Sequence, residues 1–205
     1  MQKIRFYNVL SRKKELFKPI RTAWVGLYTC GPTVYNFAHI GNLRTYIFED
    51  VLRRTLEYGG YKVRHVMNLT DVDDKIIRDA GRQGETIFDF VKPYEAAFFD
   101  DLAKLNIKPA WKYPKATNHI KEMIAIVKKL LAKKLAYRAD DSVYFDIKKF
   151  KPYGILSRLR QRSVKAGRRL LTPRAIPARG DADEYHKQDV QDFVLWKGRK
   201  DNEPS

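Results

Sequence analysis

The chain has 205 residues and a mass of 24.1 kDa, which suits one large domain or two small ones. Its 44% hydrophobic and 32% charged residues exclude a collagen-like or wholly disordered chain. With 41 Lys and Arg against 24 Asp and Glu, the net charge is +17, which predicts attraction to a polyanion such as nucleic acid.

The sequence shows no signal for a membrane or for secretion. No stretch approaches the ~18 uninterrupted apolar residues of a membrane span, and residues 1–14 lack the apolar core of a signal peptide. We therefore expect no membrane partner and a cytoplasmic location. Cys30 is the only cysteine, so no internal disulfide can form.

The first predicted elements form a strand, a helix and a strand. Residues 24–29 are a short apolar run before the breakers Gly31 and Pro32, which predicts a buried strand with an abrupt end. Residues 39–58 predict a helix that ends at Gly59-Gly60, because Leu43, Ile47, Val51 and Leu56 recur at helical spacing. Residues 61–69 alternate as a second strand. Together they predict a βαβ unit with a right-handed crossover.

The rest of the chain is predicted as helices followed by strands. Asp71 is expected to cap a short helix that stops near Gly81. Further helices are expected over residues 85–105, with a kink or break at Pro93, and over 117–134, with a core-facing stripe of Ile120, Ile124, Val127 and Leu131. A hairpin over 136–147 turns at Asp140-Asp141, and residues 193–196 form a last short strand.

The excess positive charge is concentrated between Arg158 and Gly180. This segment holds eight basic residues and no acidic one, with Gly and Pro residues that favour a loop. A solvated linker and an arm that contacts phosphates explain it equally well.

The most informative segment joins the first strand to the first helix. The carboxyl end of a parallel strand is where ligands bind in α/β sheets, and a helix N-terminus offers N–H groups to phosphates. His39 and Asn42 are three residues apart on the first helical turn, and Gly41 between them leaves room for a ligand. Simple capping is the alternative reading of an isolated His-x-x-Asn.

His39-Ile40-Gly41-Asn42 resembles the H-I-G-H signature of class I aminoacyl-tRNA synthetases. Residues 27–46 and the run from Asn68 to Ile77 are specifically similar to the cysteinyl-tRNA synthetase family, and further matches follow in family order to Lys197. The resemblance implies an α/β fold with a Rossmann-like parallel-sheet core and an inserted α+β connective segment. Residues 1–110 would be the first half of the catalytic domain, and 111–205 a helix, hairpin and basic connective segment.

The resemblance also implies an ATP site at the helix start, with Mg²⁺ as the companion of ATP. His39 and Asn42 would be the catalytic residues that bind phosphate oxygens, although Asn42 departs from the second histidine and cannot become cationic. Thr33, Tyr35, Asn36 and Gly41 would complete the ATP-binding residues.

The family's amino-acid pocket would contain Cys30, Gly31 and Thr70. Cys30 matches the first of four zinc ligands, and Zn²⁺ would bind the substrate thiolate, which serine cannot imitate. Without the resemblance, Cys30 reads as a buried small hydrophobe, and Thr70 as the start of a turn with Asp71.

The expected activity is cysteine–tRNA ligase, with L-cysteine, ATP and tRNA(Cys) as partners. The family's other zinc ligands and its K-M-S-K-S loop are absent, so we expect a truncated amino-terminal fragment with little activity alone. Two alternatives stay open: a non-catalytic paralogue that binds RNA or nucleotides, and the related ligase that joins cysteine to an amino sugar.

Overall fold

The computed structural model describes residues 3–21, 24–156 and 192–198. Their helices and strands, in chain order, are β1 (Arg5–Asn8), β2 (Lys13–Leu16), β3 (Val25–Thr29), α1 (Ile40–Tyr58), β4 (Val63–Met67), α2 (Asp74–Gln83), α3 (Ile87–Lys104), η1 (Ala116–His119), α4 (Ile120–Ala132), β5 (Ala136–Ala139), β6 (Ser142–Phe145), η2 (Ile147–Lys149) and β7 (Phe193–Trp196). The basic segment from Arg158 to Gly180 lies outside the described residues. None of the helices in the described ranges is long and apolar enough to cross a membrane.

The chain divides into two compact units. The first contains residues 1–7, 14–123 and 200–205, and the second contains residues 8–13 and 124–199. The division between residues 123 and 124 falls within α4, and the boundary predicted at residue 110 stays a prediction. In the first unit, the segment after α3 runs along β4: the Trp111 N–H donates to the His65 carbonyl at 2.8 Å, and the Leu69 N–H donates to the Pro114 carbonyl at 2.8 Å.

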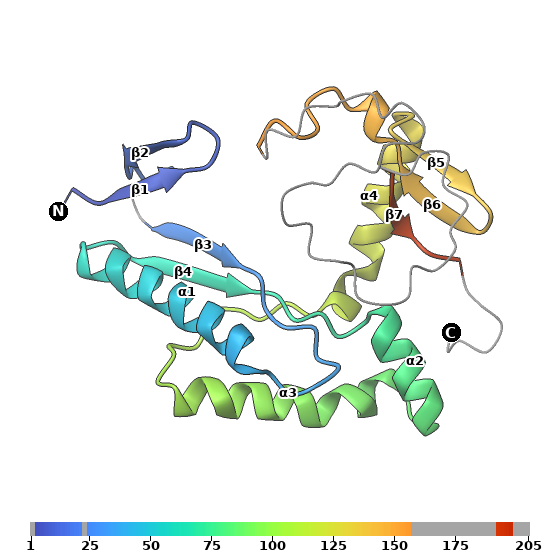
Figure 1. Cartoon of the computed structure of the whole chain (residues 1–205), viewed down its shortest axis with the longest axis horizontal. Helices are drawn as coiled ribbons and strands as arrows, with labels where there is room; N and C mark the ends of the chain where they lie inside the picture. Colours follow the sequence, from blue (N-terminus) through green and yellow to red (C-terminus); the bar gives the residue numbers. More distant parts are fainter. Residues whose placement is uncertain (1–2, 22–23, 157–191, 199–205) are drawn as a thin grey trace, which may run out of the picture. The chain divides into compact units, whose positions relative to one another are not determined.

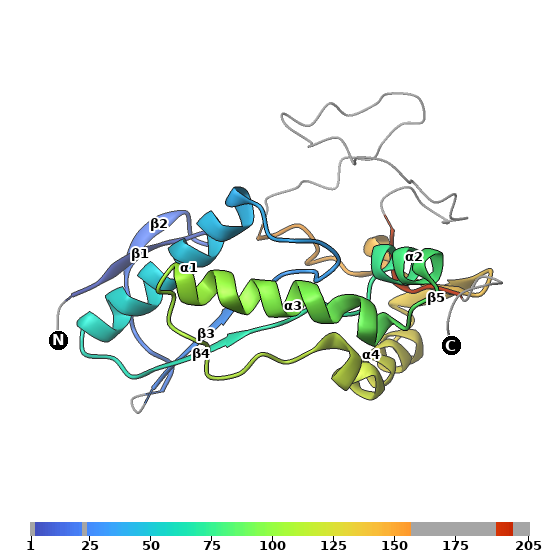
Figure 2. The ribbon, with the colours of Figure 1, turned by 90° about the horizontal axis from the view of Figure 1, so that it is seen from below.

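The predicted βαβ unit is confirmed. β3 and β4 are parallel, with Val25 opposite Val63 and Thr29 opposite Met67, and α1 connects them. Isolated parallel bridges from Val66 and Leu69 add the segment after α3 as a short third strand-like edge. Figures 1 and 2 show α1 and α3 on the same face of this sheet.

The strand predicted over residues 24–29 is present, but only one of its faces is buried. Val25 and Thr29 are buried, whereas Gly26 and Tyr28 are exposed, Tyr28 by 68%. The prediction of a wholly buried strand is therefore wrong. An apolar run alone does not reveal that, within the described residues, helices cover one face of the sheet.

The helix α1 begins where predicted, but only part of the expected apolar set faces the core. Tyr46, Glu49, Asp50 and Leu56 are its buried residues, whereas Ile47 and Val51 are 42% and 53% exposed. The helix faces the core through Tyr46, whose ring meets that of Phe98 of α3 edge-on at 5.3 Å between centroids. The prediction considered only apolar side chains, so it missed the buried carboxylates of Glu49 and Asp50.

The cap of α2 is a second correction. Asp73 caps it, by accepting a hydrogen bond from the Lys75 N–H, and the helix continues past Gly81 to a left-handed Gly84. Asp71 instead is buried and accepts hydrogen bonds from the backbone N–H and the hydroxyl of Thr117, at 2.9 and 2.5 Å. It joins the end of β4 to η1, a tertiary contact that the sequence does not reveal.

The remaining elements mostly follow the prediction. α3 starts at the cap Thr86 and runs through Pro93 as one helix. The expected stripe of α4 is only half-buried, and no residue of α4 is fully buried. In the second unit, β5 and β6 form the predicted hairpin, and β7 pairs antiparallel with β6. The β1–β2 hairpin was not predicted.

Candidate active site

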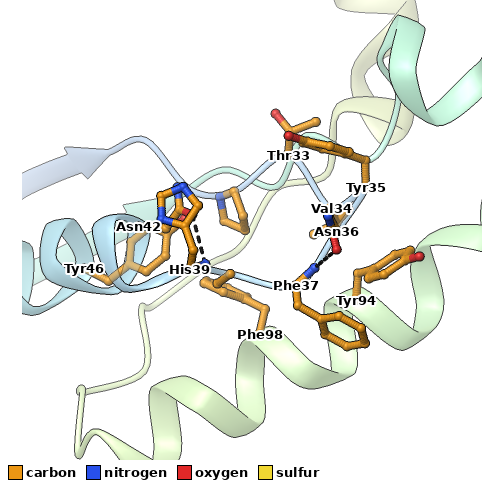
Figure 3. Close-up of a pocket in the computed structure, with 12 residues that line it drawn as sticks. Thr33, Val34, Tyr35, Asn36, Phe37, His39, Asn42, Tyr46, Tyr94 and Phe98 are labelled. Carbon is orange, nitrogen blue, oxygen red and sulfur yellow. Dashed lines mark hydrogen bonds between the residues drawn. The ribbon is translucent and has the colours of Figure 1, made fainter.

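The first turn of α1 is closed by a reciprocal pair of hydrogen bonds. Nδ1 of His39 accepts a hydrogen bond from the Gly41 N–H at 3.0 Å, and Oδ1 of Asn42 accepts one from the His39 N–H at 3.2 Å. Figure 3 shows the second of these bonds. His39 is thus the N-cap of the helix, and the two side chains form a capping box.

This capping also decides which atoms face solvent. Because Nδ1 of His39 is an acceptor, the neutral ring carries its proton on Nε2, which is therefore a donor. Because Oδ1 of Asn42 is occupied, its NH₂ group is the free end of the amide. Both side chains are exposed. The capping and phosphate-binding readings of His-x-x-Asn are therefore compatible.

The missing side chain of Gly41 makes room for the His39 ring, whereas the prediction was that it makes room for a ligand. A Cβ at position 41 would lie 2.8 Å from Cε1 and 3.0 Å from Nδ1 of the His39 ring. The glycine lets the imidazole fold over the helix start and accept the capping bond. This is a different reason for glycine from the one predicted.

A pocket of about 210 Å³ lies beside the helix start (Figure 3). It is lined by Pro32, Thr33, Val34, Tyr35, Asn36, Phe37, Ala38, His39, Asn42, Tyr46, Tyr94 and Phe98. Among the predicted site residues, Thr33, Tyr35, Asn36, His39 and Asn42 are in this lining, and Cys30, Gly31, Gly41 and Thr70 are not.

The aromatic wall of the pocket was missed by the sequence analysis. Tyr94 and Phe98 are one helical turn apart on α3, and the ring of Phe37 meets Tyr94 at 5.2 Å between centroids. Because Tyr94 and Phe98 are four residues apart, the sequence predicts that they share one side of a helix. It does not reveal which loop that side contacts. On the other side, Nζ of Lys75 lies 4.6 Å from the centroid of the Tyr35 ring.

The strand ends beside this loop are tied together by Asn68. Its Oδ1 accepts hydrogen bonds from the Tyr28 hydroxyl at 2.9 Å and from the Gly31 N–H at 3.3 Å. Its Nδ2 donates to the Thr70 hydroxyl at 3.3 Å. Asn68 therefore positions both Gly31 and Thr70, two of the residues predicted to contact the amino acid.

Gly31 is required by a close approach of two backbones. A Cβ at this position would lie 1.9 Å from the Asn68 carbonyl oxygen, which no side chain can tolerate. Beyond it, Thr33 and Thr70 form a parallel bridge, so the loop continues along the β4 side of the sheet. The pairing brings the cysteine-bearing loop and Thr70 to the same edge.

The thiol of Cys30 is exposed, in contrast to the reading of Cys30 as a buried hydrophobe. Sγ lies 3.6 Å from the Gly31 carbonyl oxygen. Within the described residues, no group of three or more His, Cys, Asp or Glu side chains could hold a metal ion. The described part of the chain therefore offers one thiolate ligand and does not make a zinc site by itself.

A buried polar chain lies next to the loop. Oγ1 of Thr29 is 2.8 Å from Nε2 of His65, and Thr29, His65 and Glu49 of α1 are all buried. Burial raises the pKa of Glu49 and lowers the pKa of His65. Burial, with smaller effects of Glu49 and Cys30, raises the pKa of Tyr46 to about 12. Burial therefore disfavours the charged form of each of these three groups.

Comparison with known proteins gives consistent matches. Residues 16–205 match the family model described as tRNA synthetases class I (C) catalytic domain. A cysteine–tRNA ligase of Protochlamydia amoebophila is 51% identical over 195 residues, 95% of this chain and 39% of the relative. One of Leptospira interrogans is 50% identical over 98% of this chain and 40% of the relative. The chain thus spans about 40% of the length of these relatives.

A solved structure supports the fold alone. The crystal structure of the ternary complex of Agrobacterium radiobacter K84 agnB2 LeuRS, tRNA and LeuAMS aligns with a TM-score of 0.51 at 22% identity, over 64% of this chain and 17% of that chain. Together with the parallel pairing of β3 and β4, this match confirms the predicted Rossmann-like α/β class.

Proposed function

Because the chain belongs to the family of class I (C) tRNA synthetase catalytic domains, we propose that it forms the amino-terminal part of the active site of a cysteine–tRNA ligase. In that reaction the carboxylate of L-cysteine attacks the α-phosphate of ATP, which gives cysteinyl-adenylate and releases pyrophosphate. The cysteinyl group then passes to the 3′-terminal ribose of tRNA(Cys), and AMP leaves. The proposal includes a cytoplasmic location.

His39 and Asn42 are the proposed catalytic residues. Nε2–H of His39 and the NH₂ group of Asn42 are donors held by the capping box, at the positive end of the α1 dipole. Donors fixed before the reaction stabilise charge that develops on phosphate oxygens. Since Asn42 stays neutral, its role is to position a phosphate or ribose oxygen.

Thr33, Tyr35 and Asn36 are proposed to bind ATP along the same pocket, where Phe37 and Tyr94 offer aromatic faces for a base. Gly41 supports the site indirectly, because it admits the His39 ring. Mg²⁺ would accompany the triphosphate and neutralise part of its charge.

Cys30, Gly31 and Thr70 are proposed to bind the cysteine. Cys30 would be one thiolate ligand of Zn²⁺, and the other ligands would come from outside the described residues. When bound, such an ion selects a thiol over a hydroxyl. Gly31 and Thr70 are both tied to Asn68, so they would fix the orientation of the amino acid.

One observation carries the proposal: the residues predicted to bind ATP and those predicted to bind cysteine lie at the same edge of the sheet. The Thr33–Thr70 bridge and the Asn68 bonds join the cysteine-bearing loop to the end of β4, and the same loop lines the pocket that His39 and Asn42 enter. The ~50% identity to cysteine–tRNA ligases over nearly the whole chain supports the same substrate.

The test is a chimaera in which this chain replaces the matching part of the Leptospira relative. Cysteine-dependent ATP–pyrophosphate exchange is measured for the chimaera and two variants. Cys30→Ser should raise the cysteine KM by at least about tenfold and lower bound zinc, with the ATP KM unchanged. His39→Asn, which keeps a capping side chain, should lower kcat by about 10²-fold. A chimaera without exchange, or variants that match it, would contradict the proposal.

A further inference from the structure

Tyr46 of α1 is a wall residue of the pocket whose hydroxyl group has no partner. It lies one helical turn after Asn42, so both side chains project from the same side of α1 (Figure 3). The residue is 3% exposed, and its ring is fixed by the edge-on contact with Phe98, yet its hydroxyl forms no hydrogen bond with any residue that the structure describes. Buried polar groups are normally paired, so an unpaired phenol in a pocket wall indicates a contact with a ligand.

The Tyr46 hydroxyl is also accessible from the pocket. Among the described residues, the fully enclosed side-chain atoms without a partner belong to Ser11, Arg12, Glu49 and His65. The Tyr46 oxygen has no partner either, but it is not one of these enclosed atoms, so it retains some exposed area. Since Tyr46 lines the pocket, a ligand there can reach this oxygen.

The carboxyl group of Glu49 follows on the same side of the helix. Glu49 is three residues after Tyr46 and 8% exposed, and its Oε2 atom is buried without a hydrogen-bond partner. It forms no ion pair with a cation in the described ranges, whereas the adjacent buried carboxylate of Asp50 pairs with Arg54. A buried carboxylate without a cation is unfavourable, so a cation bound nearby would stabilise its charged form.

The electrostatic surroundings of the phenol favour a cation. Burial, then the charge of Glu49 and last that of Cys30, raise the pKa of Tyr46 to about 12. Glu49 and Cys30 are both negative when charged, so the potential at the phenol oxygen is favourable for a positive group. In L-cysteine and ATP, the only cationic group is the α-ammonium of the amino acid.

We propose that the Tyr46 hydroxyl binds the α-ammonium group of L-cysteine. The phenol oxygen would accept a charge-assisted hydrogen bond from the ammonium. Glu49 does not line the pocket, so it would act without contact, through the negative potential that it sets at Tyr46. The inference rests on the proposed function and adds to it a contact that distinguishes L-cysteine from other thiols.

The first experiment measures cysteine-dependent ATP–pyrophosphate exchange in the chimaera with the Leptospira relative. Tyr46→Phe keeps the ring that packs on Phe98 and removes the hydroxyl, so it should raise the cysteine KM by about tenfold and leave the ATP KM unchanged. The matched control is Tyr113→Phe, which removes a phenol that packs against the same core cluster but does not line the pocket. Its cysteine KM should equal that of the parent.

Two small thiols separate the ammonium from the carboxylate of the substrate. Cysteamine carries the thiol and the ammonium, 3-mercaptopropionate carries the thiol and the carboxylate, and each is tested as a competitive inhibitor against cysteine. Tyr46→Phe should raise the inhibition constant of cysteamine by about tenfold and leave that of 3-mercaptopropionate nearly unchanged. A larger change for 3-mercaptopropionate would mean that the hydroxyl binds the carboxylate and would overturn the proposal, as would equal changes for both compounds.

Glu49→Gln separates a role in binding from a role in folding. The change removes a buried ionisable group, so the variant should be at least as stable as the parent at neutral pH. Because the negative charge is lost, the cysteine KM and the cysteamine inhibition constant should nevertheless increase by about threefold. A stable variant with unchanged cysteamine inhibition would overturn the role assigned to Glu49.

Failure of this inference and failure of the proposed function give different results. A chimaera without exchange contradicts the proposed function, and this inference with it. Exchange that is impaired by Cys30→Ser but unchanged by Tyr46→Phe overturns this inference alone. Circular dichroism melts of the parent and the variants show whether a change in KM is accompanied by a loss of folding, and a Tyr46→Phe variant that melts with the parent but binds cysteine more weakly supports the contact.

Discussion

The two halves of the candidate active site are held in place by different kinds of contact. At the start of α1, His39 and Asn42 are fixed by hydrogen bonds that span at most three residues, and both are exposed. At the strand ends, Gly31 and Thr70 are fixed through Asn68, and the tie at Gly31 spans 37 residues. A local motif tolerates change in its surroundings, whereas the strand-end half exists only in the folded sheet.

The comparison predicts that substitutions in the strand-end half lower stability more than substitutions at the helix start. Gly31→Ala should have the largest effect, about 3 kcal/mol, because its Cβ would overlap the Asn68 carbonyl. Urea unfolding measures it. Gly81→Ala is the matched control, since its Cβ meets nothing within 4 Å in α2, and it should be neutral or stabilising. Equal effects of the two would contradict the prediction.

The second-largest effect is expected for Asp71→Ala. The change leaves the half-buried Thr117 N–H and hydroxyl without their acceptor, which should cost about 2 kcal/mol. The cap residue Asp73, changed to Ala, should cost about 1 kcal/mol. A double-mutant cycle of Asp71→Ala with Thr117→Val checks the cause: the two losses should be non-additive, and simple additivity would show that the contact is not the source.

At the helix start the expected effect is smaller. His39→Ala removes the capping acceptor and should lower the free energy of unfolding by about 1 kcal/mol. His39→Asn retains an acceptor for the Gly41 N–H and should unfold within a few tenths of a kcal/mol of the parent. Thermal and urea unfolding of both variants separate capping from ligand binding. A destabilised Asn variant would show that the imidazole does more than cap.

The smallest effect concerns the pH dependence of stability. Burial raises the pKa of Glu49, so the folded chain retains this proton to a higher pH than the unfolded chain. Stability is therefore lost as pH rises from the unfolded pKa through the folded pKa. Glu49→Gln removes this loss, so its gain over the parent should be near zero at pH 4 and increase toward neutral pH. Urea unfolding at several pH values measures it, and parallel profiles would contradict it.

The local half of the site could be predicted from the sequence. The end of β3, the start of α1 and the strand β4 follow from breakers, periodicity and a capping pattern, each readable within a few residues. Five of the nine predicted site residues line the pocket for the same reason, since all five lie between Thr33 and Asn42, in the loop after β3 and the first turn of α1.

The tertiary half could not be predicted in this way. Which stripe of α1 is buried depends on α3, where Phe98 meets Tyr46, and the buried Asp50 accepts a hydrogen bond from the N–H of Lys108, 58 residues away. The role of Asp71 depends on Thr117, 46 residues away. Asn68 has no motif that identifies it as a tie between strand ends. These features depend on contacts between residues far apart in the chain, and the periodicity of a sequence does not show such contacts.

The two sides of the strand β3 differ in their main-chain hydrogen bonds. Along one side it pairs with β4, and within the described residues no strand pairs along its other side. Unsatisfied main-chain groups in a row act as a template for another extended segment. High protein concentration should therefore promote association of copies through β3, and light scattering at increasing concentration measures it.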